Sequence, residues 1–533
     1  MCGRKNLIRL QPALLLRDFG VLSPRGRKPV KFGARMKTYV LNLATILLSV
    51  FSGFIVAVAF PPWNQSWLIW VGFIPALCAL LLFSRHWGLG LLRGLAFGGT
   101  FGGFLFSWLL SSGRLADWLT NTISLALLGG IWGLFVGSLV QLPAKSVKSK
   151  LSPILPGYGF TSESWSKSLA HLRAALVIAA GWTVLEWARG VLLPGWNAVG
   201  TVLEANLPLL KVATVTGVSG LTFMALFANV IVLTTVRRLV LEPSRMTWAD
   251  RFDVTVTLGI IFLSALAGFW TLERRSGNET RNIALISPAG TQFTHLLELS
   301  KGAAEKGIDL FVWRCVRFEP GDYATVEGAS IGKTAALVTG VTNVEDGVVG
   351  GASVILPESV KNILVMPARH DFFQPGIAPV SRTLNPFDFN NISWVPLLNW
   401  EAGDPLLIRS AVKAQAQVLI ALVDPSLVTR PGVEQLFLNL RSWAVAWGRP
   451  LIFATVKGMS AIMSGSGRFA GDARSAPDPE VLIGRIEIPA ASELTFYGRY
   501  GDWFAIACGV VGIFTGFSER LRKRYEKSGR VAP

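Results

Sequence analysis

The sequence is poor in charge and in metal-binding side chains. Only 16% of its 533 residues are charged, whereas 51% are hydrophobic, which is low in charge for a soluble protein and normal for a membrane protein. The four histidines show no ligand spacing, and the four cysteines are scattered at Cys2, Cys78, Cys315 and Cys508. This pattern gives neither a disulfide framework nor a zinc motif. We therefore expect no metal site.

Acidic residues are the scarcer charged type, at 33 against 51 basic residues, which leaves a net charge of +18. An excess of this sign can indicate nucleic acid binding. Here the basic residues fall between long apolar stretches and at both ends of the chain, so they do not form one basic domain. We therefore expect no nucleic acid partner.

Long apolar stretches, in contrast, are numerous. A helix needs roughly 20 apolar residues to cross a hydrocarbon core of about 30 Å. The third stretch is rich in glycine (LAFGGTFGGFLF), which favours close helix packing. We predict a multi-pass α-helical membrane bundle of about eight spans. They are expected at about 39–60, 66–83, 89–112, 119–141, 171–193, 208–236, 253–272 and 502–518.

The basic residues also predict the orientation of these spans. They are frequent before the first span, after the fourth, after the sixth and in the tail, whereas the loops PPWNQSW and GRLADW hold almost none. By the positive-inside rule, both termini are expected in the cytoplasm. The first 37 residues lack the apolar core of a cleavable signal peptide, so we interpret them as a basic tail.

The segment between the seventh and eighth predicted spans has a different texture. Short β-branched runs, such as RNIALISPA, GIDLFVW and AQVLIALVDP, alternate with helical stretches such as GVEQLFLNLRSWAVAWG. This alternation predicts an α/β domain. The distribution of basic residues among the loops, by the positive-inside rule, predicts that this domain is exported. The expected organisation is a basic tail at 1–38, a seven-span bundle at 39–272, the exported domain at 273–501, the eighth span at 502–518 and a basic tail at 519–533.

Four segments carry a resemblance to a known family: EWARGVLLPGWNAVG (186–200), PLLKVATVTGVSGLTFMALFANVIV (208–232), FVWRCVRF (311–318) and RSWAVAWGRPLIFATVKGMSAIMSGSGR (441–468). Together with the predicted architecture, they resemble the bacterial apolipoprotein N-acyltransferases, the membrane-bound branch of the carbon–nitrogen hydrolase (nitrilase) superfamily. The resemblance covers about 45–518. It implies a nitrilase-like α-β-β-α sandwich for the exported domain.

The resemblance also implies a chemistry, a location and partners. These enzymes move an acyl chain from a phospholipid to a cysteine thiolate, and then to the N-terminal amine of a lipoprotein. The thiolate attacks, a glutamate moves the protons and a lysine stabilises the tetrahedral intermediate, with no cofactor. The implied location is the bacterial inner membrane, with the nitrilase-like domain on the periplasmic face. Phospholipid and lipoprotein are the implied partners.

Residue by residue, this sequence departs from the family at its reactive positions. The family glutamate falls on Cys315, the lysine on Ala368 and the nucleophile on Asn399. Beside the last position, only the aromatic Trp400 and the glutamate Glu401 keep their type. An asparagine amide cannot form a thioester, and loss of a nucleophile lowers a rate by about 10⁴- to 10⁶-fold.

Cys315 and Glu401 are weak candidates for a rearranged catalytic site, Cys315 as the nucleophile and Glu401 as the acid or base. Cys315 stands beside Arg314 and close to Arg317, and neighbouring cations favour a thiolate. It appears directly after a predicted strand, but its only candidate bases are Glu319 and Glu401. We favour a structural role, because free cysteines are commonly small buried hydrophobic residues.

Glu186 and Arg189 stand three residues apart on one face of a predicted span. Charges inside a span cost about 2.5 to 3.5 kcal/mol on insertion scales, so they usually form pairs or line a cavity. Either they pair with each other, or they form a polar wall for a lipid head group. Trp400 is a third candidate for lipid binding.

Two functional hypotheses follow. The first is an active N-acyltransferase with an altered site, and the second is a non-catalytic pseudoenzyme that binds lipid or lipoprotein, or scaffolds a membrane-enzyme partner. A transporter fits poorly, because no inverted repeat is visible and the large exported domain would be unexplained. The substituted reactive positions favour the second hypothesis.

Overall fold

The computed structural model describes most of the chain. The described residues are 32–83, 86–140, 162–192, 198–241, 248–272, 279–288, 293–316, 335–342, 349–356, 362–365, 384, 386–423, 429–455, 459–472 and 480–527. The chain divides into two compact units, Met1–Ala44 and Thr45–Pro533. In the first unit, the described residues form only the beginning of helix α1 (Phe32–Val58).

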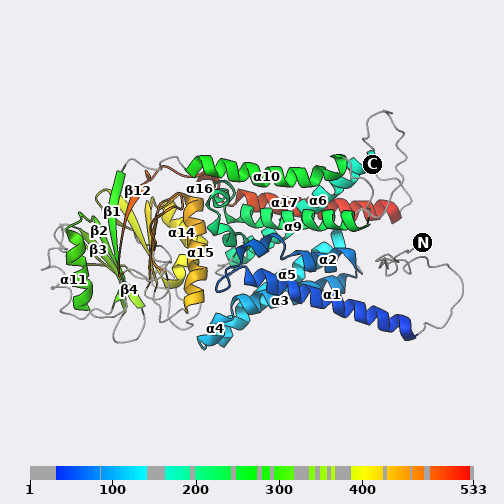
Figure 1. Cartoon of the computed structure of the whole chain (residues 1–533), viewed down its shortest axis with the longest axis horizontal. Coiled ribbons are helices and arrows are strands. Elements are labelled where there is room, and N and C mark those ends of the chain that lie inside the picture. The colour runs from blue at the N-terminus through cyan, green and yellow to red at the C-terminus, as the bar shows by residue number, and fades with distance from the viewer. Residues whose placement is uncertain are drawn as a thin grey trace, which may run out of the picture. The chain divides into compact units, whose positions relative to one another are not determined.

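The apolar part of the second unit is helical (Figure 1). After α1 its elements are η2 (Ser66–Trp70), α2 (Ile74–Leu82), α3 (Trp87–Leu105), α4 (Trp108–Ser111), α5 (Leu115–Leu139), α6 (Ser162–Leu192), η3 (Val199–Ala205), α7 (Leu207–Leu210), α8 (Ala213–Thr216), α9 (Val218–Leu241), α10 (Trp248–Leu272) and, near the end of the chain, α17 (Trp503–Lys527).

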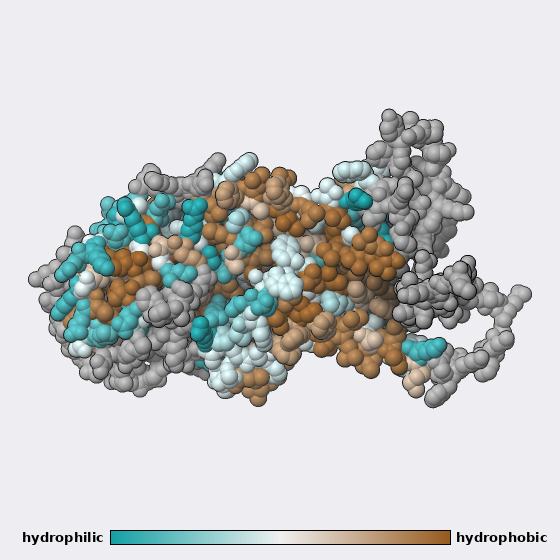
Figure 2. Space-filling model, viewed as in Figure 1, coloured by the Kyte–Doolittle hydropathy of each residue, from teal (hydrophilic) through white to brown (hydrophobic). Residues whose placement is uncertain are grey.

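Five helices in the described part of the chain are long and apolar enough to cross a membrane. They cover Met36–Val58, Leu115–Leu139, Trp165–Leu192, Val218–Val240 and Arg251–Leu272. Shorter apolar helical segments lie at Ser66–Leu82, Leu207–Thr216 and Trp503–Ser518. Figure 2 shows hydrophobic side chains gathered over these helices and hydrophilic ones over the sheets. The chain therefore has the character of a membrane protein, although the expected count of about eight spans is not confirmed.

Two predicted spans are interrupted. The segment 208–236 is not one helix, because Gly217 between α8 and α9 has φ +67°, a left-handed conformation that interrupts the helix. The segment 89–112 divides into α3 and α4, because the carbonyl oxygen of Leu105 accepts a hydrogen bond from the side chain of Gln435 at 2.9 Å. Leu109 N–H instead bonds to Phe106, three residues back.

The expected close packing of the glycine-rich helix is confirmed. Gly94 and Gly98 of α3 lie against Gly129 and Leu125 of α5, so close that a methyl group on either α3 glycine would overlap the α5 backbone. A methyl group at Gly90 would lie 2.8 Å from the carbonyl oxygen of Gly133. Small residues thus let the two backbones meet.

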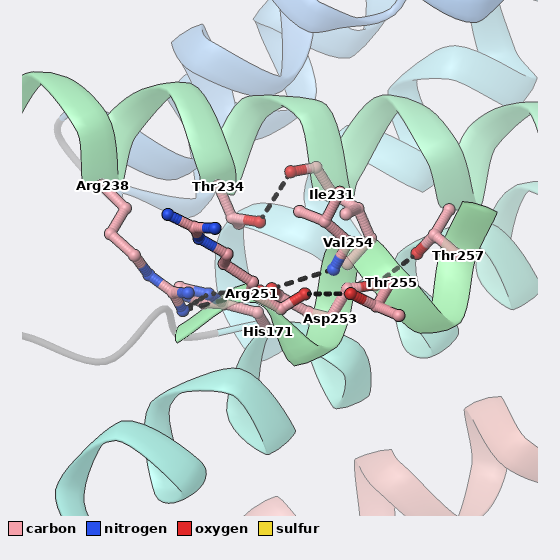
Figure 3. A network of polar contacts seen from close by, with 9 residues as sticks. All are labelled: His171, Ile231, Thr234, Arg238, Arg251, Asp253, Val254, Thr255 and Thr257. Carbon is pink, nitrogen blue, oxygen red and sulfur yellow. Dashed lines mark hydrogen bonds and ion pairs between the residues drawn. The ribbon is translucent and has the colours of Figure 1, made fainter. Parts of the chain in front are cut away.

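A buried charged cluster joins α10 to α6 and α9 (Figure 3). His171 Nδ1 of α6 lies 3.1 Å from Asp253 Oδ2 of α10. Arg238 Nη2 of α9 lies 2.8 Å from His171 Nδ1 and 3.5 Å from Asp253 Oδ2. Asp253 is fully buried, so the guanidinium compensates a carboxylate that would otherwise be costly between apolar helices.

The β-strands form two six-stranded sheets. In sheet order, the first contains β12 (Val481–Ile488), β1 (Glu279–Ile286), β2 (Leu310–Val316), β3 (Ala336–Thr342), β4 (Val349–Ile355) and β5 (Asn362–Val365). The second contains β11 (Phe469–Asp472), β10 (Ala461–Met463), β9 (Leu451–Thr455), β8 (Val418–Val423), β7 (Ile392–Leu398) and β6 (Phe387–Phe389). The central strands β1–β3 and β7–β9 are parallel.

The two sheets are stacked between helices, as Figure 1 shows. Alternate residues of β2 explain the layers: Leu310 and Val312 belong to the core shared with the second sheet, whereas Phe311 and Trp313 pack under helix α11 (Phe293–Ala304). Helices α14 (Pro405–Lys413) and α15 (Arg430–Trp447) cover the other side. The α-β-β-α layering expected from the resemblance is present, while the domain limits at 273 and 501 stay a prediction.

Candidate functional site

The loop after β7 is built by its own polar residues. Strand β7 ends at Leu398, and the short helix η4 (Asn399–Gly403) follows directly. Glu401 Oε2 accepts a hydrogen bond of 2.9 Å from the N–H of Leu398. Asp404 then caps α14 by accepting from the N–H of Leu406 at 2.9 Å, and Pro405 opens that helix.

Glu401 therefore has a definite structural contact. Its side chain is buried and turns back to the strand residue that precedes the loop, which fixes the turn between β7 and η4. The backbones of Asn399 and Trp400 lie in η4, directly after the carboxyl end of β7, but their side chains are outside the described residues. Ala368 also lies outside the described residues.

The prediction that Cys315 comes directly after a strand is wrong, because Cys315 lies within strand β2. Strand β2 continues to Val316 because its pairing with β3 resumes there after a bulge. The strand belongs to the first sheet, whereas η4 follows a strand of the second. The neighbouring Arg314 is buried, and its carbonyl oxygen accepts a 2.9 Å hydrogen bond from Thr339. The side chain of Cys315, and the whole of Arg317 and Glu319, are outside the described residues.

Helix α15 connects this site to the helical bundle through Gln435. The side-chain nitrogen of Gln435 donates to the carbonyl oxygens of Pro61 and Leu105, both at 2.9 Å. Its side-chain oxygen accepts from the indole N–H of Trp108 at 3.1 Å. One fully buried amide thus satisfies backbone and side-chain groups at the ends of α1 and α3.

Two further polar residues of α15 extend this connection. Asn439 donates to the carbonyl oxygen of Gly403 at 3.1 Å, so α15 also holds η4. Arg441 forms a buried ion pair with Glu204 of η3 and donates to the carbonyl of Gly467 at 2.9 Å. Sequence reasoning missed these residues, although polar side chains inside the apolar run VEQLFLNLRSWAVAW were a visible signal.

Glu186 connects its own helix α6 to η3 and α9 through hydrogen bonds. One carboxylate oxygen accepts from the N–H of Val199 at 2.9 Å and from the indole N–H of Trp182 at 3.3 Å. The other accepts from the hydroxyl of Thr222 at 2.7 Å. Both oxygens are therefore engaged by groups other than Arg189, the partner that the sequence suggested.

Arg189 and Glu186 also line a common cavity, which we call the junction pocket. Its volume is about 50 Å³, measured as the space open to the centres of water-sized molecules. Residues of α6, the start of α9, α14, α15 and the segment before α17 surround it. They are Glu186, Trp187, Arg189, Gly190, Val191, Ala198, Val218, Ser219, Pro405, Leu406, Arg409, Trp443, Tyr497 and Asp502.

An ion pair closes one side of the junction pocket. Arg409 Nη1 lies 3.1 Å from Asp502 Oδ2, and the hydroxyl of Tyr497 donates to Asp502 Oδ1 at 2.7 Å. Burial and the neighbouring Asp502 carboxylate raise the pKa of Tyr497, which lies in the short helix α16 (Phe496–Tyr500). Tyr497 thus stays a neutral donor. The side chain of Trp400, the third predicted lipid-binding residue, lies outside the described residues.

Comparisons with known proteins agree with this architecture. Residues 52–231 match the model of the apolipoprotein N-acyltransferase N-terminal domain. The apolipoprotein N-acyltransferase of Geobacter metallireducens is 24% identical, covering 87% of this chain and 92% of that protein. The enzyme of Thermotoga maritima is 23% identical, covering 90% and 95%.

Solved structures are similar to about two fifths of the chain. An amidase of the nitrilase superfamily from Nesterenkonia is 15% identical and covers 40% of this chain and 91% of its own, with a TM-score of 0.32. A carbon–nitrogen hydrolase from Helicobacter pylori is 14% identical and covers 39% and 89%, also with a TM-score of 0.32. A structural similarity with this TM-score does not bear on the function of the chain.

The apolar helices and the stacked sheets define a membrane protein that carries an α-β-β-α sandwich. The relatives agree with it over most of the length of both chains. The chain is thus similar to the apolipoprotein N-acyltransferases over most of its length, and its residues 52–231 match the N-terminal domain of that family.

Proposed function

We propose that this protein is a catalytically impaired member of its family, which binds phospholipid or lipoprotein in the bacterial inner membrane without carrying out acyl transfer. Its sandwich domain lies on the periplasmic face and both termini lie in the cytoplasm. Its role in lipoprotein maturation is that of a binding protein or a scaffold for a membrane-enzyme partner.

One observation carries the proposal. Asn399 opens η4 directly after the parallel strand β7, at the position where the family resemblance expects the nucleophilic cysteine. A carboxamide has no useful nucleophilicity at neutral pH, so the acyl-enzyme step has no acceptor there. Cys315 and Ala368 stand at the expected glutamate and lysine positions, which removes the proton carrier and the oxyanion cation as well.

The contacts around the loop support a retained scaffold. Glu401 holds the turn after β7, Asn439 holds Gly403, and Gln435 joins the same helix to the bundle. These contacts hold the loop in place although it lacks a nucleophile, which is the arrangement expected of a binding protein that derives from an enzyme.

The test uses a bacterium depleted of its own N-acyltransferase. The full chain is expressed there, and the N-termini of lipoproteins are read by mass spectrometry. We expect diacylated N-termini only, with a relative that carries the complete set of reactive residues as the positive control. Triacylated lipoprotein that disappears in the Cys315→Ala variant would establish an active enzyme with a relocated nucleophile and overturn the proposal.

A further inference from the structure

We infer that His171 is a proton-operated switch, which exchanges its partner between Arg238 of α9 and Asp253 of α10 (Figure 3). The three side chains lie far from the junction pocket, because that pocket takes its residues from the start of α9, whereas Arg238 belongs to the last turn of that helix. The inference goes beyond the proposed function, since it concerns how a helix is attached to the bundle and not acyl transfer or ligand binding.

One ring nitrogen of His171 meets two groups that require opposite protonation states. Its Nδ1 lies 2.8 Å from Nη2 of Arg238 and 3.1 Å from Oδ2 of Asp253. A guanidinium nitrogen only donates hydrogen bonds, and an ionised carboxylate only accepts them. Nδ1 can therefore bond to Arg238 only through its lone pair and to Asp253 only through a proton, so it cannot bond to both at once.

The protonation state of Nδ1 thus selects the partner. When the neutral ring carries its proton on Nε2, Nδ1 accepts from Arg238. When both ring nitrogens carry protons, the imidazolium donates a charge-assisted hydrogen bond to Asp253 and repels the guanidinium. The exchange takes up one proton from solvent, breaks one hydrogen bond and forms another. Histidine changes its charge between about pH 5 and 8, so acidification transfers His171 from α9 to α10.

The positions of Asp253 and Arg238 permit this exchange. Asp253 is fully buried, and its Oδ1 accepts from the N–H of Val254 at 3.0 Å, so Oδ2 is the oxygen that meets the ring. Arg238 lies in the last turn of α9, where a long cationic side chain can extend toward the membrane surface when the ring repels it. The carboxylate is thus fixed beside the ring, while the guanidinium has a place to go.

The other charged groups near the cluster are basic. Among the described residues at this end of α6, α9 and α10 they are Lys167, Arg173, Arg237 and Arg251. Helices α5 and α17 also pack against α6. The only charged residue of α5 is Asp117, in its first turn, and α17 holds none between Trp503 and Ser518. Asp253 is therefore the described acidic group that attracts the protonated ring.

The exchange matters for α10 because this helix is the least buried of the five candidate spans. Within the described part of the chain, 17% of its apolar window is buried, against 33–78% in the other four. Near its other end, Gly268 lies directly against the backbone of Pro208. The next described element after α10 is β1, in the first sheet. The switch therefore acts on the attachment of the helix that leads into the sandwich.

The experiment is hydrogen–deuterium exchange of the purified full chain in detergent, at about pH 8 and about pH 5. Each rate is corrected for the intrinsic effect of pH on amide exchange. Two segments are compared, 234–241 at the end of α9 and 252–259 near the start of α10. On acidification we expect protection to fall about threefold to tenfold in the first segment and to rise about threefold in the second, because a hydrogen bond to a charged group moves from one to the other.

Two variants and a control locate the effect. His171→Asn keeps a polar group near the position of Nδ1 but cannot take up a proton, and Asp253→Asn removes the carboxylate that receives the protonated ring. Both are expected to abolish the opposite changes. The control is His295→Asn, because His295 also lies 3.5 Å from a carboxylate, that of Glu480, but both side chains are exposed. This variant should show the same two changes as the unaltered chain.

Each outcome decides the inference. Any result other than opposite changes in the two segments of the unaltered chain overturns the exchange of partners, and so do opposite changes that persist in folded His171→Asn or vanish in His295→Asn. If the variants of the cluster do not fold, the signs of the two changes in the unaltered chain still decide. The result is separable from the proposed function, because acyl transfer is read from lipoprotein N-termini in cells.

Discussion

A hydrogen bond from Asn439 to Gly403 joins helix α15 to the short helix η4, yet the chemistry of the two elements differs. The polar residues Gln435 and Arg441 of α15 are buried and bonded to groups of the helical bundle. In η4 the buried Glu401 accepts from the N–H of Leu398 in its own turn, and the sequence has Asn399 instead of a nucleophile. The polar contacts that join the sandwich to the helical bundle are therefore present, whereas a nucleophilic side chain at the start of η4 is not.

The largest effect is expected at the ion pair of α15. Arg441→Ala leaves Glu204 buried without its partner, and breaking a buried pair in this way costs about 3–5 kcal/mol. The thermal midpoint of the purified protein in detergent should fall clearly. Arg430→Ala is the matched control, since Arg430 of the Arg430–Glu434 pair in the same helix is exposed and an ion pair with an exposed partner contributes about 1 kcal/mol or less. Equal effects of the two variants would remove the contrast between buried and exposed pairs.

A second effect is expected at Gln435. Gln435→Leu keeps a similar volume but leaves the carbonyl oxygens of Pro61 and Leu105 without their donor. A buried group left without a partner costs about 1–3 kcal/mol, so we expect a loss of about 2–4 kcal/mol and faster proteolysis in the loop after α1. An unchanged proteolysis pattern would show that Gln435 does not hold this loop.

A smaller effect is expected in the loop. Glu401→Gln keeps an oxygen that accepts from Leu398 N–H, so stability should fall by less than about 1 kcal/mol, whereas Glu401→Ala should cost about 1–2 kcal/mol. Thermal melting in detergent measures both. If Glu401→Gln were as damaging as Glu401→Ala, the carboxylate would have a role beyond this hydrogen bond.

The smallest effect is expected at Asn399. Asn399→Ala should leave the N-termini of lipoproteins diacylated, as with the unaltered chain, because neither a carboxamide nor a methyl group can act as a nucleophile. The mass spectrometry in the depleted bacterium measures it. A difference in triacylated lipoprotein between the two chains would show that Asn399 takes part in acyl transfer.

Local patterns predicted much of this fold. Alternating β-branched runs and helical stretches indicated the α/β part, and the glycine-rich run anticipated the α3–α5 packing. The predicted span at 208–236 failed because hydropathy ignores backbone conformation, and Gly217 with φ +67° interrupts the helix there.

The candidate site was less predictable. Glu186 and Arg189 were predicted either to pair with each other or to form a polar wall, and neither alternative included the bonds that Glu186 accepts from Val199 and Thr222. Contacts such as Gln435 with Pro61 join residues 374 positions apart, and no local period encodes them. Periodicity reports which face of an element is buried, and it does not identify the group that a buried polar side chain meets.

The most direct test of the central claim is an intact-mass measurement of the purified full chain after incubation with phospholipid, before and after hydroxylamine. The account predicts no added acyl mass, because Asn399 cannot hold a thioester. A hydroxylamine-sensitive acyl adduct on the unaltered chain, absent from Cys315→Ala, would contradict it.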